Sequence, residues 1–451
     1  MFVHLDVGWL RHPFPVNSFR ISSAEQLETL RSLGLEQVRY EPAKSDLSPG
    51  PEADPTPAPA PEPVSAAEQK PMDTPPQFFG LSPESRAPFL SSPSAATPGS
   101  SRLLSAPLGE MTTERRLAAE QRRLICCDQR FAAAAEQYHS VVQVVHEDAF
   151  SARAACLALV TECVDDLQCN GESVIRLLTE RVGERGSMHS VNVMVLCLLL
   201  GRAQGLSAPE MQELGLAALL HDSGKLSLPL HAHAPAAAPK GITTTQPVDE
   251  GGLYENHVGA SVALAQSMDL SSAVLIAIAQ HHESADGSGF PLGLLDEDFS
   301  PAGRILALVN RYDGLCNPIN HDEALTPHEA LAVLFSRMKS HFDPVTLNAF
   351  IRMMGVYPPG SVVQLVNGLY ALVISVNSAR PLRPKVLVHD PDAHSATPPV
   401  LDLEHLPELG ILRSLKPAQL PRAALDDLSP RQRIYYFFER AAELPRPEGL
   451  L

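Results

Sequence analysis

The sequence predicts a mainly α protein with a small α+β unit at its N-terminus and a short β-rich appendage near its C-terminus. From about residue 110 to 355, apolar residues recur at helical spacing almost without interruption. A Pro-rich stretch separates this helical block from the first 45 residues. After Pro358-Pro-Gly360, short β-branched runs replace the helical pattern.

The composition is that of a soluble globular protein. The chain has 451 residues, 44% hydrophobic and 19% charged, which allows two or three domains and one sizeable core. Its net charge of −17 disfavours binding to a nucleic-acid polymer or an anionic membrane. The seven cysteines contain no C-x-x-C pair, so we expect mostly buried, reduced thiols in a cytoplasmic protein. No signal peptide is evident, and the longest apolar run, Val193–Leu200, is far shorter than the ~20 residues of a membrane span.

Residues 1–45 are predicted to form the small α+β unit. Phe2–Leu5 is strand-like, Ser22–Leu33 has a Ser cap and helical spacing of apolar residues, and Leu35–Tyr40 returns as a strand. Residues 46–108 alternate Pro with Ala, Ser and Glu and cannot bury enough apolar surface to offset chain entropy. We therefore expect a disordered linker there.

The helical block opens with a helical segment at 109–183, rich in alanine and preceded by Thr caps. Further helices are predicted at 187–204, 208–220, 255–267, 271–281, 300–316, 326–340 and 343–355, with a loop at 231–252. Runs at 361–366, 370–376 and 385–389 predict a three-stranded extension over 357–391. Residues 392–451 are predicted to be a polar, Pro-rich tail with one amphipathic helix at 430–444.

The run His221–Lys225 follows an apolar helix and is the most informative stretch of the chain. The His221 imidazole and the Asp222 carboxylate can bind metal ions, a carboxylate can bridge two of them, and Lys225 can meet an anionic substrate. A His-Asp pair alone is common and is usually a surface pair. Other ligands must therefore come from elsewhere in the chain.

Four further histidines lie where predicted helices begin or end: His189, His257, His281 and His282. One such histidine is usually a packed core residue, but the whole set with His221 and Asp222 is hard to explain as core. Imidazoles with one carboxylate favour Fe, Mn, Zn, Co or Ni over Mg. Two such ions can activate water and stabilise the leaving oxygen of a phosphodiester. The set therefore predicts metal-dependent phosphoester hydrolysis.

Over residues 185–355, the chain resembles the HD-GYP subfamily of HD-domain phosphohydrolases. The resemblance rests on His221-Asp222-x-Gly-Lys225, His257, the long motif from His281 to Pro291, and Arg304-Ile-Leu. It implies an HD-domain helical bundle at 184–356. It also implies a bacterial cyclic di-GMP phosphodiesterase that forms pGpG or continues to GMP.

Residues 4–45 resemble the small N-terminal domain of unknown function that precedes many HD-GYP modules, truncated at its first strand. This similarity rests on Trp9–Phe14 and Pro42–Ser45. The segment at 358–390 is similar to the β-rich extension of the same group.

The resemblance implies a role for each motif residue and two divalent transition metals, Fe or Mn. It places His189, His221 and Asp222 on one metal and His257, His281 and His282 on the other, with Asp222 bridging. Lys225 contacts the scissile phosphate, while Glu283 and Asp286 orient imidazoles and fix a substrate loop containing Gly287, Gly289, Phe290 and Pro291. A GGDEF-type cyclase is the implied protein partner, and the oligomeric state stays open.

The chain departs from the family pattern at several positions. Asn310 stands where the family has a metal-binding Asp, and an amide oxygen is a weak neutral ligand; Asp313 follows one turn later. A substrate-facing Arg is replaced around Asn317–Ile319, Phe290 replaces the name-giving Tyr, and Arg185 replaces a Glu that supports a third metal in some members. The loop at 231–252 also lacks the usual Lys-Pro-Gly.

Two hypotheses remain open. One is a working dinuclear phosphodiesterase. The other is a catalytically weak or inactive module that binds cyclic di-GMP or a protein partner in signalling.

Overall fold

The computed structural model describes residues 2–4, 18–21, 39–40, 113–168, 172–179, 184–227, 254–391 and 398–440. The chain divides into two compact units, Met1–Ala87 and Pro88–Leu451, which are described separately. The predicted linker at 46–108 and the predicted loop at 231–252 lie outside the described residues.

The first unit contains a three-stranded antiparallel sheet in the order β2-β1-β3. Its strands are β1 (Phe2–His4), β2 (Ser18–Arg20) and β3 (Arg39–Tyr40). The strands predicted near both ends of this unit are confirmed in β1 and β3, whereas β2 was not predicted. The helix predicted at 22–33 lies outside the described residues.

The second unit is built mainly of helices. They are α2 (Thr113–Val144), α3 (Ala149–Gln168), α4 (Arg185–Ala203), α5 (Ala208–Leu220), α6 (Asn256–Ser267), α7 (Ser272–Ala279), α8 (Pro301–Cys316), α9 (Pro327–Ser336), α10 (Pro344–Met354) and α11 (Arg422–Leu428). Short 3-10 helices are η4 (Ser223–Ser227), η6 (Asp296–Asp298), η7 (His321–Glu323), η8 (Lys339–His341), η9 (Leu403–His405) and η10 (Pro417–Gln419). The helices predicted from 187 to 355 are confirmed in α4–α10 to within a few residues.

Local signals explain why these helices begin where they do. The side chains of Ser271, Ser300, Thr326 and Asp343 each accept a backbone N–H from the first turn that follows. Proline occupies the start of α8, α9 and α10, where its missing N–H costs no helical hydrogen bond.

A seven-stranded antiparallel sheet completes the second unit. Its strands are β4 (Ser173–Leu177), β5 (Val362–Leu365), β6 (Tyr370–Asn377), β7 (Lys385–His389), β8 (Val400–Asp402), β9 (Ile411–Leu415) and β10 (Tyr436–Arg440). The order is β10-β4-β6-β5-β9, and β7 pairs with both β6 and β8. The three strands predicted at 357–391 are thus confirmed as β5–β7, but they form less than half of the sheet.

Two sequence predictions for this unit are wrong. The helical segment expected at 109–183 contains β4, which pairs with β6 and β10. The helix expected at 430–444 is the strand β10, and the tail expected to be polar also carries β8, β9 and α11. The reason is burial: Tyr435–Phe438 are all buried, as in a strand covered on both faces, whereas an amphipathic helix would expose one side.

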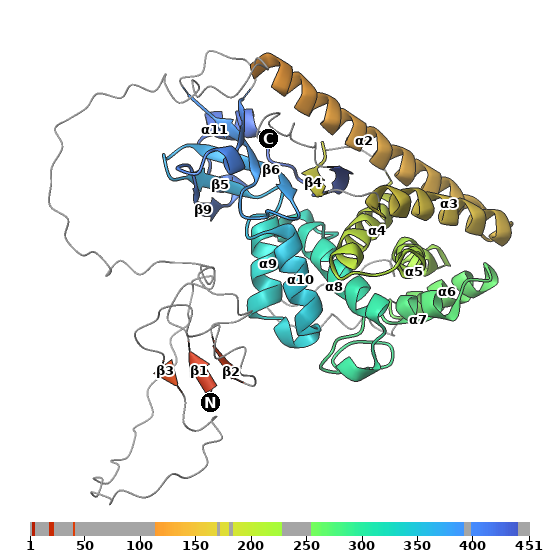
Figure 1. Ribbon diagram of the computed structural model, residues 1–451. Helices are drawn as coiled ribbons and strands as arrows, with labels where there is room; N and C mark the ends of the chain where they lie inside the picture. The colour runs from red at the N-terminus through yellow and green to blue at the C-terminus, as the bar shows by residue number, and fades with distance from the viewer. Residues whose placement is uncertain are drawn as a thin grey trace, which may run out of the picture. The chain divides into compact units, whose positions relative to one another are not determined.

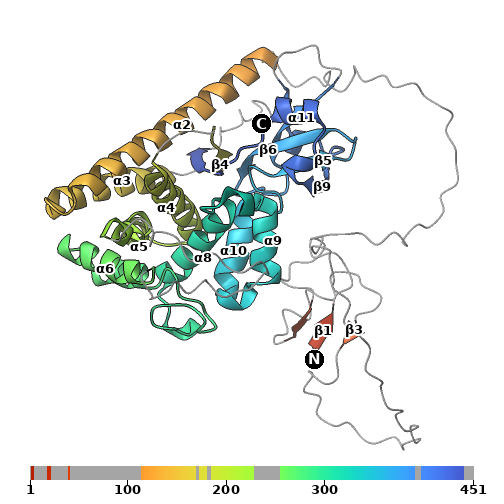
Figure 2. The same ribbon diagram turned by 180° about the vertical axis from the view of Figure 1, so that it is seen from behind.

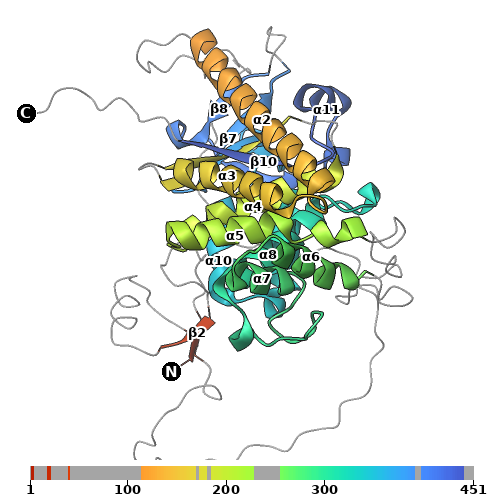
Figure 3. The same ribbon diagram turned by 90° about the vertical axis from the view of Figure 1, so that its right-hand side faces the viewer.

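The sheet and the helices share one hydrophobic core. In Figure 1 and Figure 3 the C-terminal strands lie beside α2, and β10 contacts both α2 and α4. Buried residues of β4 and β10 belong to the same cluster as those of α3–α5 and α8–α10. A smaller second core, including Val363, Val373 and Val386, is formed within the sheet. The β-rich part is therefore integral to the domain.

Helix α4 runs through the middle of the unit (Figure 2). Among the described residues it is the helix long and apolar enough to cross a membrane, but 78% of its apolar window is buried inside the protein. Such burial is typical of a core helix. The prediction of mostly buried thiols is confirmed for the cysteines that the structure describes. Five of them are free and buried, namely Cys127, Cys156, Cys163, Cys197 and Cys316, and Cys126 is free and exposed.

Candidate metal centre

The structure brings the predicted ligand side chains together where four helices meet. His189 lies in the first turns of α4, His221 and Asp222 follow α5, His257 lies in the first turn of α6, and His281 and His282 follow α7. These helices pack on one another in the pairs α4–α5, α5–α7 and α6–α7. Helix ends far apart in sequence therefore meet at one point.

Asp222 stands between two groups of histidines. Its Oδ2 lies 3.5 Å from His189 Nε2 and 3.6 Å from His221 Nε2. Its Oδ1 lies 3.3 Å from His257 Nε2 and 3.7 Å from His281 Nε2. The potential ligand atoms of His189, His221 and Asp222 lie within 4.8 Å of one another, as do those of Asp222, His257, His281 and His282. One carboxylate thus faces two donor groups through different oxygens.

The backbone fixes which nitrogen of three imidazoles faces the cluster. His221 Nδ1 donates to the Ala218 carbonyl at 2.8 Å, and His281 Nδ1 donates to the Ile278 carbonyl at 2.6 Å. His257 Nδ1 makes the same contact with the Tyr254 carbonyl. A carbonyl oxygen only accepts, so Nδ1 carries the hydrogen and the neutral ring presents an Nε2 lone pair. This is the tautomer that a metal ligand requires.

His189 is oriented differently, by a buried carboxylate. Its Nδ1 lies 2.5 Å from Asp313 Oδ2. Asp313 is itself held, because its Oδ1 accepts amide hydrogens from Asn192 at 2.6 Å and from Asn317 at 2.9 Å. Burial alone would lower the pKa of His189, but Asp313 and Asp222 raise it above its usual range.

The other charges suit cation binding. Burial lowers the pKa of His221 to about 4 and holds the pKa values of His281 and His282 well below their usual range, so these rings are neutral at pH 7. Burial alone would raise the pKa of Asp222, but Lys225 and the neighbouring imidazoles hold it well below its usual range. Asp222 is therefore an anion beside the neutral imidazoles of His221, His281 and His282.

Lys225 and Tyr254 lie at the edge of the cluster. Lys225 Nζ is 2.5 Å from Asp222 Oδ2 and 5.3 Å from the centroid of the Tyr254 ring. That ring packs against the His257 ring, with 4.7 Å between centroids, and the Tyr254 hydroxyl is 3.4 Å from His282 Nε2. Sequence reasoning missed Tyr254; its one local signal is its place three residues, about one helical turn, before His257.

The predicted substrate loop is tied to itself by its acidic residues. Buried Glu283 accepts the backbone N–H groups of Leu292 at 2.6 Å and Leu294 at 3.0 Å. Asp286 accepts the backbone N–H and hydroxyl of Ser288 at 3.1 and 2.6 Å. Among the described contacts, both acids thus hold the loop, while backbone carbonyls and Asp313 orient the imidazoles.

Glycine is required at two positions of this loop. Gly287 has a positive φ of 78°, and a Cβ on Gly289 would lie 2.3 Å from the Ser284 backbone nitrogen. The tight path brings the Phe290 ring onto His282, with 4.6 Å between centroids and 21° between planes, and Pro291 follows through a cis peptide bond. The loop therefore forms one wall of the cluster.

Comparison with known proteins agrees with this geometry. The family model of the HD domain matches residues 172–346, and that of a domain of unknown function (DUF3391) matches residues 1–155. Residues 172–346 thus match the HD domain, as the resemblance implied. The second match runs beyond residue 45, the limit predicted for the N-terminal unit, and through α2.

Three curated relatives carry enzyme names. The cyclic di-GMP phosphodiesterase PA4108 of Pseudomonas aeruginosa is 34% identical over 218 residues, 48% of this chain and 50% of the relative. The cyclic di-GMP phosphodiesterase response regulator RpfG of Xanthomonas campestris is 32% identical over 157 residues, 34% of this chain and 39% of the relative. The 3'3'-cGAMP-specific phosphodiesterase 2 of Vibrio cholerae is 26% identical over 187 residues, 40% of this chain and 34% of the relative. The chain spans half or less of the length of these relatives.

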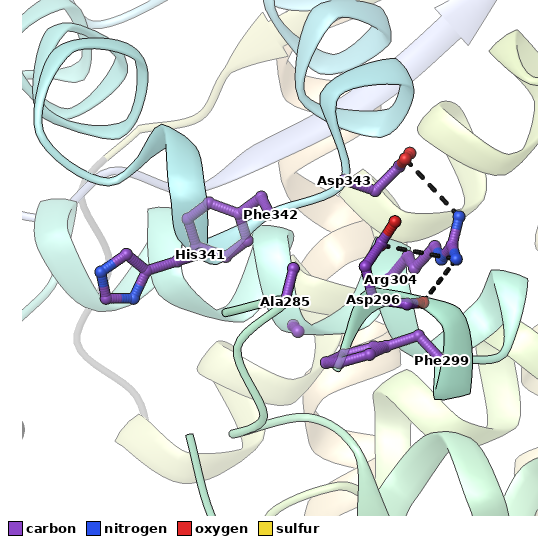
Figure 4. A pocket seen from close by; sticks show the side chains of 8 residues that line it. Ala285, Asp296, Phe299, Arg304, His341, Phe342 and Asp343 are labelled. Carbon is purple, nitrogen blue, oxygen red and sulfur yellow. Dashed lines mark hydrogen bonds and ion pairs between the residues drawn. The ribbon is translucent and has the colours of Figure 1, made fainter. Parts of the chain in front are cut away.

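Arg304, part of the HD-GYP-type pattern, anchors the far end of the loop (Figure 4). Its Nη2 donates to the Asp296 carbonyl at 2.6 Å, and its Nη1 lies 3.5 Å from Asp343 Oδ1 at the start of α10. A cavity of about 10 Å³, lined also by Phe299 and His341, lies beside this contact. Arg304 therefore joins the loop to α8 and α10.

Two departures from the HD-GYP pattern meet on one side of the domain. Arg185 Nη2 donates to the Asn317 carbonyl at 2.8 Å, and the Asn317 amide donates to Asp313. One oxygen of Asp313 therefore accepts from Asn317, while its other oxygen contacts His189. The structure describes no contact of the half-buried Asn310 amide with the histidines, so its predicted role as a weak ligand stays a prediction.

Proposed function

We propose that this chain is a metal-dependent phosphodiesterase that hydrolyses cyclic di-GMP to the linear dinucleotide pGpG or on to GMP. The observation that carries the proposal is the position of Asp222, whose two oxygens face two separate groups of imidazole nitrogens. The names of two relatives, which match about half of their length or less, support the choice of substrate.

The residues present fit a pair of divalent transition metals. Asp222 Oδ1 is buried without a hydrogen-bond partner, and His257 Nε2 beside it carries no hydrogen in the neutral tautomer. A buried anionic oxygen without a donor is costly unless a cation occupies the space beside it. Imidazole nitrogens with one carboxylate suit Fe or Mn, the metals proposed here, and also Zn.

His189, His221 and Asp222 would hold one ion, and His257, His281 and His282, with Asp222 bridging, the other. When bound, two such metals supply Lewis acidity and activated water for attack on phosphorus.

The chain's own side chains bind and orient the substrate. Lys225 keeps a positive charge beside the cluster, because Asp222 raises its pKa although burial alone would lower it. That ammonium group is suited to a phosphate oxygen. Phe290, stacked on His282, and the tight turn at Gly287–Pro291 form the wall against which a nucleotide would lie.

A second function is favoured by one position, Asn310. Where it replaces a carboxylate ligand, the first donor group has only His189, His221 and the shared Asp222 among the described His, Cys, Asp and Glu side chains. A weakly held first metal would leave a module that binds cyclic di-GMP without efficient turnover. In both cases we place the protein in the cytoplasm, with a GGDEF-type cyclase as its candidate partner.

Metal analysis and turnover test the proposal together. The full chain is purified anaerobically, its metals are counted, and conversion of cyclic di-GMP and of 3'3'-cGAMP is followed by chromatography. Turnover of cyclic di-GMP that His221→Ala abolishes, and that the exposed control His321→Ala leaves intact, supports the enzyme. Bound metal and bound nucleotide without turnover, with activity gained on Asn310→Asp, supports the binding module. Absence of bound metal under these conditions would refute the ligand assignment and the enzyme.

A further inference from the structure

Tyr254 is a buried aromatic residue that faces the histidine cluster. The residue is only 8% exposed, yet it belongs to neither of the two hydrophobic core clusters. The centroid of its ring lies 4.7 Å from that of His257, 5.7 Å from that of His282 and 6.2 Å from that of Phe290. Its described aromatic neighbours are thus two candidate metal ligands and one residue of the substrate loop.

The Tyr254 backbone orients one of these ligands. Its carbonyl accepts the Nδ1 hydrogen of His257, which leaves the Nε2 lone pair free for a metal. Two other imidazoles are oriented in the same way by Ala218 and Ile278, whose side chains are buried in the main hydrophobic core. Tyr254 differs from these two residues because its side chain also contacts the cluster.

His282 is the imidazole whose orientation depends on ring contacts. The other four imidazoles of the cluster each have a partner for Nδ1, whereas the described hydrogen bonds include none to Nδ1 of His282. Phe290 stacks on the His282 ring, with 4.6 Å between centroids, and the Tyr254 hydroxyl lies 3.4 Å from His282 Nε2. Aromatic rings pack with preferred offsets and angles, so such contacts restrict the direction of the ring. Apart from other imidazoles, Phe290 and Tyr254 are therefore the described groups that hold this ligand.

We propose that Tyr254 is a positioning residue of the second donor group. That group consists of Asp222, His257, His281 and His282. The Tyr254 carbonyl sets the direction of the His257 ring, and the Tyr254 ring, together with Phe290, sets that of the His282 ring. The inference rests on the proposed function for the assignment of these side chains as metal ligands. Groups that orient ligands in advance strengthen metal binding, so loss of the Tyr254 side chain weakens the second metal more than the first.

Three variants separate the contributions of the ring and the hydroxyl. Tyr254→Leu keeps an apolar side chain and the backbone carbonyl, and it should weaken the second metal about tenfold, the lower end of the effect of losing a group that orients a ligand. Tyr254→Phe keeps the ring contacts and loses only a long hydroxyl contact, so its affinity should stay within about threefold of native. Phe290→Leu removes the stacked ring and should weaken the same metal about 2- to 10-fold.

Competition with a chromophoric chelator for Mn²⁺ measures metal affinity of the full chain. Each variant is made in the native sequence and in two backgrounds: His189→Ala disables the first group and His281→Ala the second, so the remaining ion reports on the other group. The matched control is Tyr357→Leu, because the Tyr357 ring stacks on His328, outside the cluster, with 5.1 Å between centroids. This control should leave Mn²⁺ affinity unchanged. Tm is recorded for every chain.

Selective loss at the second group is the result that the positioning role requires. Tyr254→Leu should weaken Mn²⁺ binding in the His189→Ala background, and Tyr254→Phe should recover it. Equal weakening in both backgrounds would show that the residue only supports the fold and would overturn the positioning role. Affinities of Tyr254→Leu and Phe290→Leu that both stay within about twofold of the native chain would overturn it as well, whatever happens to Tm.

Metal affinity separates this inference from the proposed function. Native turnover of cyclic di-GMP, with metal affinity unchanged by Tyr254→Leu and Phe290→Leu, overturns the positioning role and leaves the enzyme. A native chain that binds metal without turnover fails as an enzyme but still tests the positioning role through affinity. A native chain that binds no metal overturns the ligand assignment and, with it, both.

Discussion

Replacing Asp313 by Asn tests whether Asp313 orients His189 in the first donor group, which consists of His189, His221 and Asp222. Asp313 is buried, with Oδ2 at 2.5 Å from His189 Nδ1 and Oδ1 accepting from Asn192 and Asn317 at 2.6 and 2.9 Å. An Asn side chain has one oxygen, so it cannot accept from the imidazole and from both amides. His189 then loses its orientation or its anionic partner.

The expected effect is a weaker first metal. A hydrogen bond to a charged group contributes about 1.5–3 kcal/mol, and loss of the partner behind a metal-binding imidazole weakens metal affinity about 10- to 100-fold. These ranges agree, because tenfold corresponds to about 1.4 kcal/mol.

The pH dependence has a definite sign. Asp313 raises the pKa of His189, so metal binding to the native chain must displace a proton that the Asn variant holds less tightly. The loss of affinity is therefore largest at alkaline pH, where both chains are deprotonated, and shrinks as pH falls.

Competition between the protein and a chromophoric chelator for Mn²⁺ measures this affinity at mildly acidic and mildly alkaline pH. Exposed Asp322→Asn is the matched control and should leave the affinity unchanged. An Asp313→Asn chain with native metal affinity at alkaline pH would show that the carboxylate does not position His189, and the account of the first group would have to be given up.

Three further predictions concern the loop, the last strand and acid stability. Gly289→Ala creates a contact of 2.3 Å with the backbone, so the loop must move and turnover should fall by at least about tenfold in a steady-state assay. Tyr436→Ala removes a fully buried ring and should lower the free energy of unfolding in denaturant by about 3–5 kcal/mol. Burial alone would raise the pKa of Glu120, but Arg176 and Lys385 lower it; this stabilisation is present above the unfolded pKa and is lost as pH falls through the folded pKa. Glu120→Gln should therefore flatten the decline of Tm on acidification.

Matched variants give each of these predictions a control. A Cβ on exposed Gly259 meets nothing within 4 Å, so Gly259→Ala should keep native turnover and add about 0.5–1 kcal/mol of stability. Exposed Phe150→Ala and Glu147→Gln should leave unfolding and the acid profile of Tm unchanged. Equal effects of Tyr436→Ala and Phe150→Ala would contradict the placement of β10 in the core.

The helices and the cluster of histidines around Asp222 could be predicted because their signals are local. Each helix from α4 to α10 carries its own cap or periodic apolar stripe, and the histidines stand at the helix ends. The strands β4 and β10 could not be predicted in this way. Arg176 of β4 and Glu439 of β10 form an ion pair although they are 263 residues apart in sequence. The buried part of β10, Tyr436–Phe438, also lacks the alternation of polar and apolar residues that would mark a strand.

Tyr254 illustrates a second limit. A sequence gives a residue's place along a helix, but the direction of its side chain depends on how several helices and a loop pack. Tyr254 becomes part of the site only because α6 and the segment after α7 bring His257, His282 and Phe290 around its ring.

The last strand also reaches the first donor group through a continuous set of hydrogen bonds. The Tyr436 backbone N–H donates to Asn192 at 2.7 Å, and the Ile434 backbone bonds Asn317 through both its N–H and its carbonyl at 2.8 Å. Asn192 and Asn317 in turn donate to Asp313, which holds His189.

By contrast, His257 and His281 are oriented by carbonyls three residues earlier in their own segments. His257 and His281 are thus oriented locally, as is His221, whereas His189 of the first group depends on contacts between the two ends of the domain. A disturbance of β10 should therefore release the metal at His189 and His221 before the metal at His257, His281 and His282. This is the same site at which Asn310 is predicted to be a weak ligand.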